Sequence, residues 1–336
     1  MTDLPCRRRF RRACFSTLVA CYLVILMGGL VRASGAGMGC PDWPKCFGQL
    51  IPPTAEAQLP ADYHQIYAQR GYADTRFNPA KTWTEYVNRL VGATTGLLVV
   101  FTLARAWPLR RSDPAVFATS AAILLVIGFQ GWLGSVVVAS NLKPVMITAH
   151  MAMALVLVFL LILAMARAQR PDLARFAENV LPERFRAVAG IALALTLLQI
   201  AMGTQIRQAV DPLIAQELAD RQYWRDSFPV IFYVHRSFSA LILFTNLWLA
   251  WKVLSGIRSG HPLRTTAKLL GGLVAVAVVT GISLDRLGFP AFVQPLHLLL
   301  ANLIFGTQVY LLLLLRYNGS AIGTVAGGGG WIGASG

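Results

Sequence analysis

Eight long apolar segments are the feature that most constrains what this chain can fold into. A helix that spans a bilayer needs roughly 20 apolar residues, and each segment is close to that length. The segments cover residues 14–31, 86–104, 118–139, 145–166, 187–206, 230–251, 267–284 and 290–315. Only 13% of the residues are charged, about half the fraction of soluble domains. We therefore expect an all-α integral membrane protein with eight helices, and we exclude a disordered chain, a collagen-like repeat and a nucleic-acid-binding arm.

Basic residues predict the orientation of these helices. Five arginines between positions 7 and 12 precede the first segment, which we interpret as an uncleaved helix because it is long and seven more follow. With a cytoplasmic N-terminus, the inner segments hold 18 of the 30 Lys and Arg residues and five of the 15 Asp and Glu residues. This asymmetry follows the positive-inside rule. We expect a bacterial inner-membrane protein with both termini cytoplasmic, surrounded by lipid and without a nucleic-acid partner.

The chain also repeats itself after four helices. Four pairs of matching positions occur in the same order at corresponding helix ends: Met27-Gly28 and Met202-Gly203, Tyr86-Val87-Asn88-Arg89 and Tyr233-Val234-His235-Arg236, Gly134 and Gly281, and His150 and His297. Because four is an even number, both units have the same orientation. We expect a tandem repeat of two four-helix bundles, related by a pseudo-two-fold axis along the membrane normal.

The repeat divides the chain into units and connections. The expected parts are an N-terminal unit 1–166, a cytoplasmic linker 167–186, a C-terminal unit 187–316 and a disordered tail 317–336. The N-terminal unit carries a long outer loop, 33–83, with a possible surface helix near 54–70. The matching loop of the second unit, about 207–229, is shorter and contains no cysteine.

Three of the five histidines lie inside apolar helices. His150, His235 and His297 each fall near the outer start of an even-numbered helix, so all three are expected in one layer near the outer face. Facing imidazoles in an apolar bundle are a usual way to hold haem iron. His235 and His297 belong to one unit and predict a bis-histidine haem b there. The alternative is that each ring bonds a helix carbonyl. His64 and His261 are expected at the solvated surface.

The N-terminal unit offers a different pair of side chains at the same depth. Asn88 and His150 take the places of His235 and His297, and an amide is a poor iron ligand. A haem there would have a weak or open second axial position, which suits a reacting substrate. Glu85 lies one helical turn before Asn88, where a carboxylate can accept a proton or stabilise a developing cation.

Two further arginines follow these positions directly. Arg89 comes after Asn88, and Arg236 comes after His235. A guanidinium fork suits a carboxylate, so either side chain is a candidate for binding a haem propionate. Each can equally extend to lipid headgroups.

The cysteines divide by compartment. Cys6, Cys14 and Cys21 lie inside or within the first helix and are expected as thiols. Cys40 and Cys46 lie in the first outer loop, where a disulfide can persist. Their five-residue spacer fits neither a CxxC redox motif nor the usual zinc spacings. A structural disulfide and a redox-active pair both stay open.

These motifs together resemble the haem A synthases of bacteria and mitochondria. The similar stretches are Gly28-Gly29-Leu30-Val31-Arg32 with Gly35-Ala36-Gly37-Met38, Trp43 and Pro52-Pro53, then Glu85-Tyr86-Val87-Asn88-Arg89-Leu90-Val91-Gly92, and then His150, His235-Arg236 and His297. The resemblance covers about residues 14–316. Each motif is short, but the ordered set is specific.

The resemblance implies an enzyme, an oxidoreductase that acts on a CH or CH2 group. Members oxidise the methyl group of haem O to the formyl group of haem A by successive hydroxylations, for terminal oxidase biogenesis. It implies a C-terminal haem b that passes electrons, an N-terminal site where His150, Asn88 and Arg89 bind haem O, and Glu85 as the catalytic carboxylate. Cys40 and Cys46 match the family's first-loop pair. Implied partners are haem O synthase, oxidase assembly factors and an electron donor.

One departure matters, because Asn88 stands where most members have histidine. Either the enzyme works with one axial histidine, or the N-terminal unit has lost its reaction. The second case leaves a bis-histidine b-type electron carrier or quinol-linked cytochrome without haem-modifying activity. A scaffold for oxidase assembly is a third reading.

Overall fold

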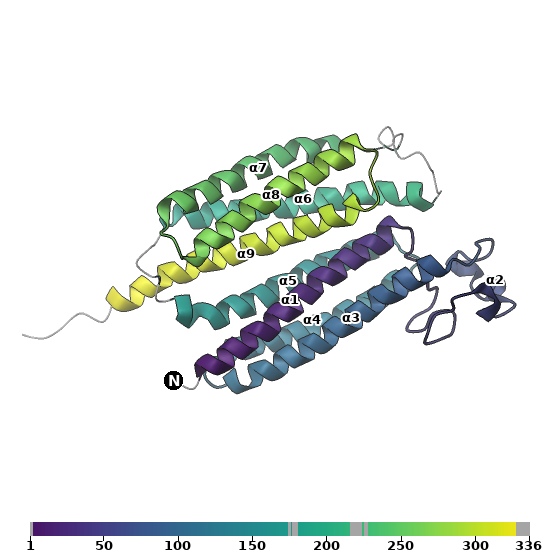
Figure 1. Ribbon diagram of the computed structural model, residues 1–336, viewed down its shortest axis with the longest axis horizontal. Coiled ribbons are helices and arrows are strands. Elements are labelled where there is room, and N and C mark those ends of the chain that lie inside the picture. Colours follow the sequence, from purple (N-terminus) through teal and green to yellow (C-terminus); the bar gives the residue numbers. More distant parts are fainter. Residues whose placement is uncertain (1–2, 174–175, 177–180, 216–223, 225–227, 327–336) are drawn as a thin grey trace, which may run out of the picture.

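The computed structural model describes residues 3–173, 176, 181–215, 224 and 228–326. Within these residues the chain is helical, with eight helices long and apolar enough to cross a membrane (Figure 1). They are α1 (Asp3–Ala33), α3 (Pro79–Ala106), α4 (Pro114–Ala139), α5 (Pro144–Leu173), α6 (Arg184–Ala215), α7 (Val230–Gly256), α8 (Pro262–Arg286) and α9 (Val293–Ala326). The described residues form no strand, only one isolated bridge between Cys46 and Gln49. The predicted all-α membrane fold is confirmed.

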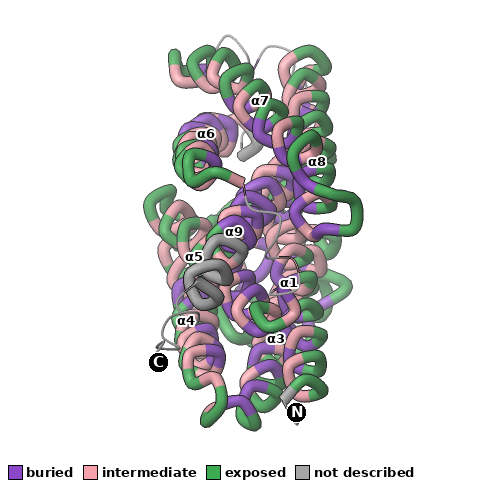
Figure 2. The backbone as a smooth tube through the Cα atoms, turned by 90° about the vertical axis from the view of Figure 1, so that its left-hand side faces the viewer, coloured by how far each residue is buried: buried purple, intermediate pink, exposed green. Residues whose placement is uncertain are grey.

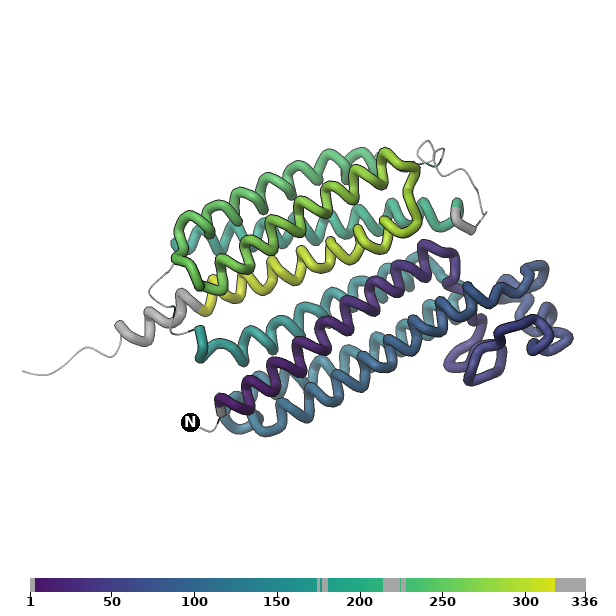
Figure 3. Tube along the Cα trace, in the orientation of Figure 1, coloured from purple at the N-terminus to yellow at the C-terminus, as the bar shows by residue number. Residues whose placement is uncertain are grey.

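The helices pack as two rings of four. In the first ring, α1 contacts α3 and α5, and α4 contacts the same two helices. The second ring repeats this pattern, since α6 contacts α7 and α9, and α8 contacts the same two. Helices α3 and α5 therefore stand on one diagonal, and α7 and α9 on the other ring's diagonal. Corresponding helices run in the same direction, as the colour gradient of Figure 3 shows.

Helix α9 joins the two rings. It contacts α1 and α5 of the first ring as well as its own neighbours α6 and α8. In the most apolar 18-residue stretch of α9, 56% of the residues are buried, against 17–39% in the corresponding stretches of the other seven helices. Figure 2 shows α9 between the two groups, with buried residues turned inward and exposed ones outward. The outward apolar side chains form the surface that lipid would cover.

Several helices start earlier than their apolar segments predict, because polar caps lie outside those segments. The Asn78 side chain accepts a hydrogen bond from the Lys81 amide, and Pro79 follows as the first helical residue, seven residues before the predicted start. Asp113 caps α4 in the same way by accepting from the Val116 amide. The first helix likewise begins at Asp3 and includes the arginine cluster.

Other boundaries also differ from the prediction. Helix α9 continues to Ala326, so the first ten residues of the predicted disordered tail are helical, and residues 327–336 lie outside the described part. The connection between the units is shorter than the predicted linker 167–186, since α5 ends at Leu173 and α6 starts at Arg184. Helix α6 extends through Ala215 into the predicted second outer loop, of which 216–223 and 225–227 are not described.

His261 is not a surface residue. Its side chain is 2% exposed, and Nδ1 accepts a hydrogen bond from the Leu263 amide as the N-cap of α8. Burial lowers the pKa of His261, so the ring stays neutral and keeps this acceptor. The prediction failed because capping satisfies the ring locally, without solvent.

The loop between α1 and α3, which the basic residues predict on the outer side and which is here called the outer loop, has its own small core. Phe47 lies at its centre and makes edge-to-face contacts with Tyr63, Tyr67, Tyr72 and Phe77. The predicted surface helix is instead three short turns: η1 (Glu56–Gln58), α2 (Tyr63–Ile66) and η2 (Ala68–Arg70). The loop lies at the end of the molecule where α3, α5, α7 and α9 begin (Figure 1).

Candidate functional site

A continuous cavity of about 2530 Å³ lies between and within the two rings. Residues of all eight long helices and of the outer loop line it. Pockets for one small molecule measure about 300–1,000 Å³, so this cavity has room for more than one large ligand. The cavity wall includes Asn88, His150, His235 and His297.

Each of the three histidines lies against a glycine of the preceding helix. A Cβ atom added to Gly134 would lie 3.3 Å from Cε1 of His150. The corresponding distances are 3.4 Å from Gly203 to His235 and 3.3 Å from Gly281 to His297. A larger residue at these places would push the ring away, so the glycines set the ring positions.

The fourth position of this pattern holds Asn88. A Cβ added to Gly28 would lie 4.0 Å from the Asn88 Oδ1. Gly28 corresponds to Gly203 in the repeat, as Asn88 corresponds to His235. The four equivalent places thus hold three imidazoles and one carboxamide. The repeat predicted that these four residues are equivalent, but not that each lies against a glycine. The sequence signal for this was a glycine in the C-terminal half of each of α1, α4, α6 and α8.

His235 and His297 face one another across the C-terminal ring. Their ring centroids are 6.5 Å apart, with an angle of 68° between the planes. A metal–imidazole bond is about 2 Å long, so two imidazoles on opposite sides of one metal have centroids about 6 Å apart. The donor set, the separation and the adjoining cavity therefore fit a haem iron.

Polar neighbours contact these histidines at the ring or at the backbone. The Thr280 hydroxyl shares a hydrogen bond of 2.9 Å with Nδ1 of His297. The Gln199 side chain donates to the carbonyl of His235 at 3.0 Å, and Gln130 donates to the carbonyl of His150 at the same distance. Both glutamines lie four residues before a glycine of the pattern, which is the sequence signal that our reading missed. The Thr280 contact holds a ring nitrogen, and such a contact fixes the orientation of a metal ligand. The glutamines hold the helix backbone, and Gln130 Nε2 also lies 3.3 Å from Nε2 of His150.

Glu85 is 3% exposed and has partners for both carboxylate oxygens. Oε2 accepts a hydrogen bond from the Cys40 amide at 2.7 Å, and Oε1 forms an ion pair with Arg89. Glu85 thus connects α3 to the outer loop and also lies on the cavity wall.

Arg89 holds the disulfide segment of that loop. Its guanidinium donates to the carbonyls of Cys40, Asp42 and Lys45 at 2.9, 2.7 and 3.0 Å. The disulfide between Cys40 and Cys46 is present. The structure therefore gives this side chain a loop-ordering role that the sequence did not predict.

Arg236 lies apart from this arrangement. It is 3.5 Å from the carboxylate of Asp285 and stacks over the ring of Tyr233, with its side chain 46% exposed. Its place in the repeat corresponds to Arg89, but these two partners belong to α7 and α8 and not to a loop segment.

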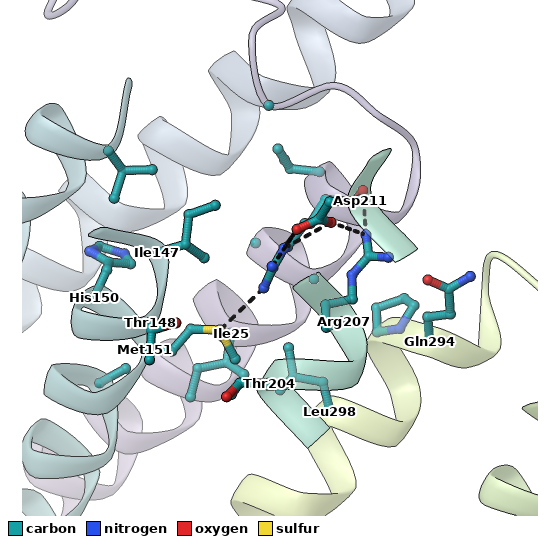
Figure 4. A pocket seen from close by; sticks show the side chains of 18 of the residues that line it. Ile25, Ile147, Thr148, His150, Met151, Thr204, Arg207, Asp211, Gln294 and Leu298 are labelled. Atoms are coloured by element: carbon teal, nitrogen blue, oxygen red, sulfur yellow. Dashed lines mark hydrogen bonds and ion pairs between the residues drawn. The ribbon is translucent and has the colours of Figure 1, made fainter. Parts of the chain in front are cut away.

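A charged cluster joins the two rings where α1 and α6 end. Asp211 accepts hydrogen bonds from Nε of Arg32 at 3.1–3.2 Å and from its Nη2 at 2.5 Å, and lies 3.3 Å from Arg207. Arg207 also donates to the Arg32 carbonyl at 2.7 Å. Figure 4 shows Asp211 and Arg207 between His150 and Gln294. Asp211 was not identified from the sequence, although it follows Arg207 by one helical turn.

Comparisons with known proteins agree with these features. Relatives named Heme A synthase include those of Methylobacterium sp. (26% identity over 89% of this chain and 90% of that protein) and Exiguobacterium sibiricum (27% identity; 86% and 89%). A third, from Shewanella oneidensis, is 38% identical over 40% of this chain and 38% of that protein. The sequence model of the cytochrome oxidase assembly protein family matches residues 11–309, nearly the whole chain. This chain therefore belongs to the cytochrome oxidase assembly protein family.

Proposed function

We propose that this protein is a haem A synthase, which oxidises the methyl group of haem O to the formyl group of haem A. The observation that carries the proposal is the match of the chain, over most of its length, to relatives with that name. The large cavity with one facing histidine pair supports it, because the reaction needs room for a haem substrate beside a redox cofactor.

The C-terminal unit would hold haem b through His235 and His297. The fit rests on the 6.5 Å ring separation, on the glycine behind each ring and on the Thr280 hydroxyl at His297. When bound, haem b supplies one-electron transfer. The protein's own task is to keep both rings oriented and to exclude lipid.

The N-terminal unit would bind haem O, with His150 as its iron ligand. Each hydroxylation is a two-electron oxidation that replaces a C–H bond of the methyl group by a C–O bond; with dioxygen as the oxidant it consumes two donor electrons and two protons and releases one water. Loss of a further water from the doubly hydroxylated carbon leaves the formyl group. Glu85 would accept a proton or stabilise developing positive charge. Arg89 would position Glu85 and the disulfide segment rather than contact the substrate, since three loop carbonyls occupy its guanidinium.

The proposed setting is a bacterial inner membrane with both chain ends in the cytoplasm and both haem sites toward the outer face. Haem O synthase would deliver the substrate, and oxidase assembly proteins would receive the product. An electron donor completes the set of partners. The three histidines lie near the starts of α5, α7 and α9, and these helices begin at the end of the molecule that carries the outer loop (Figure 1), which supports an outer position for the sites.

Pigment analysis tests this function. Cells that supply haem O should yield hydroxylated or formyl haem when they express this protein. Glu85→Gln should abolish conversion while the haem b spectrum stays intact, because the change keeps the shape and removes the basic oxygen. Normal haem b content without any oxidised haem O product contradicts the proposal.

A bis-histidine membrane electron carrier is the second candidate. Two observations favour it: Asn88 offers no imidazole, and both oxygens of Glu85 have partners. The same pigment analysis separates the candidates, because a carrier binds haem b and leaves haem O unchanged.

A further inference from the structure

The two rings offer unequal ligands at equivalent places. Asn88 and His150 stand on the diagonal helices α3 and α5, just as His235 and His297 stand on α7 and α9. The C-terminal pair supplies an imidazole from each side. The N-terminal pair supplies one imidazole and one carboxamide.

The carboxamide of Asn88 has an unsatisfied hydrogen-bond acceptor. Its Oδ1 is buried, and among the described residues it has no hydrogen-bond partner. Burying such an atom without a partner is unfavourable. Buried polar groups without a protein partner call for a ligand or water. Asn88 lines the same cavity as His150, so the partner would enter from the cavity.

An amide neither replaces an imidazole on iron nor closes the position. It can donate through Nδ2 and accept through Oδ1, so it suits a small molecule bound beneath it. The polarity and donors on the side opposite the histidine decide which ligands a haem takes.

We propose that the N-terminal haem is held by His150 alone and keeps one exchangeable coordination position beneath Asn88. That position takes water or a small exogenous ligand, such as carbon monoxide on reduced iron or cyanide on oxidised iron. The C-terminal haem, closed by two imidazoles, takes neither. This inference rests on the proposed haem content of the N-terminal unit, but not on its conversion of haem O.

The test uses the purified full chain loaded with haem b in both units. Carbon monoxide should bind one of the two haems in the wild type. Asn88→His should reduce the carbon monoxide-reactive fraction at least tenfold, because a second imidazole closes the position. Asn88→Leu should keep that fraction but weaken cyanide binding by about tenfold, because one hydrogen bond to a charged ligand is lost.

The converse substitution can be made at the equivalent position of the second unit. His235→Asn recreates the N-terminal arrangement in the C-terminal unit, and should make the second haem reactive to carbon monoxide as well. Two bound haems that both resist carbon monoxide in the wild type overturn the inference. So does a reactive fraction that survives Asn88→His unchanged, or an N-terminal unit that takes no haem.

Haem A formation is scored separately from ligand binding. Asn88-dependent ligand binding without haem A formation supports the inference and contradicts only the proposed function. Haem A formation with no reactive haem contradicts only the inference.

Discussion

The glycines behind the histidines determine how close each ring lies to the preceding helix. An alanine at Gly281 would place a methyl group 3.3 Å from Cε1 of His297, closer than most carbon contacts. The ring would have to move, and His297 also has to keep its hydrogen bond with Thr280. A glycine at this position is therefore part of the proposed haem-ligand geometry, although glycine has no side chain that could bind iron.

Gly281→Ala should weaken haem b binding in the C-terminal unit about tenfold, since overpacking a tight contact costs about 1–3 kcal/mol. Haem titration of the purified variant measures this. Gly272→Ala on the same helix is the matched control, because an added Cβ there meets nothing within 4 Å. Equal haem affinities in the two variants would show that Gly281 does not determine the position of the His297 ring.

At the scale of elements, hydrogen bonds from the Glu85–Arg89 ion pair of α3 tie that helix to the outer loop. Arg89 holds three loop carbonyls, and Glu85 holds the Cys40 amide. Gly39 permits this approach, since a Cβ there would lie 2.5 Å from the Lys81 carbonyl oxygen. Burial raises the pKa of Tyr72, so its hydroxyl remains a donor to the Met38 carbonyl at 2.9 Å. The loop is thus an ordered cover over the N-terminal part of the cavity.

Arg89→Gln should loosen this cover. The variant loses the donor fork to the loop and leaves the buried Glu85 carboxylate without its cation. Protease added to the outer side of sealed vesicles should cleave the loop at least tenfold faster than in wild type. Arg105→Gln, at the other end of α3, should leave the rate unchanged. Equal cleavage of the Arg89 variant and wild type would show that the loop is held by other contacts.

At the scale of the whole molecule, a polar cluster and α9 join the two rings. Arg32 and Asp211 are 179 positions apart in sequence and meet only because the rings pack together. Gln208 makes a second polar link, donating to the Thr148 hydroxyl at 2.9 Å. The shared cavity depends on this junction, since its wall contains residues of both rings.

Asp211→Asn should lower the free energy of unfolding by about 1–2 kcal/mol, less than for a fully buried pair because solvent reaches part of the cluster. Thermal unfolding in detergent measures the loss. A double-mutant cycle with Arg32→Gln isolates the pair, and the two effects should be non-additive. Strict additivity would mean that the ion pair does not couple the rings.

The sequence predicted the larger features, because bilayer physics is strict. A spanning helix needs a long apolar segment, so all eight helices were visible, and the repeat revealed equivalent positions such as Asn88 and His235. Helix ends were not visible, because caps such as Asn78 lie in polar sequence. The Arg32–Asp211 pair and the contacts of Arg89 join distant segments, and only the packed chain brings them together.

Haem analysis of the purified full chain tests the central claim most directly, since that claim is that His235 and His297 together bind an iron porphyrin. The wild type from haem-sufficient cells should show a six-coordinate, low-spin b-type spectrum, and His235→Ala or His297→Ala should each abolish it. A colourless wild-type protein, or a low-spin spectrum that persists in both variants, would contradict the account.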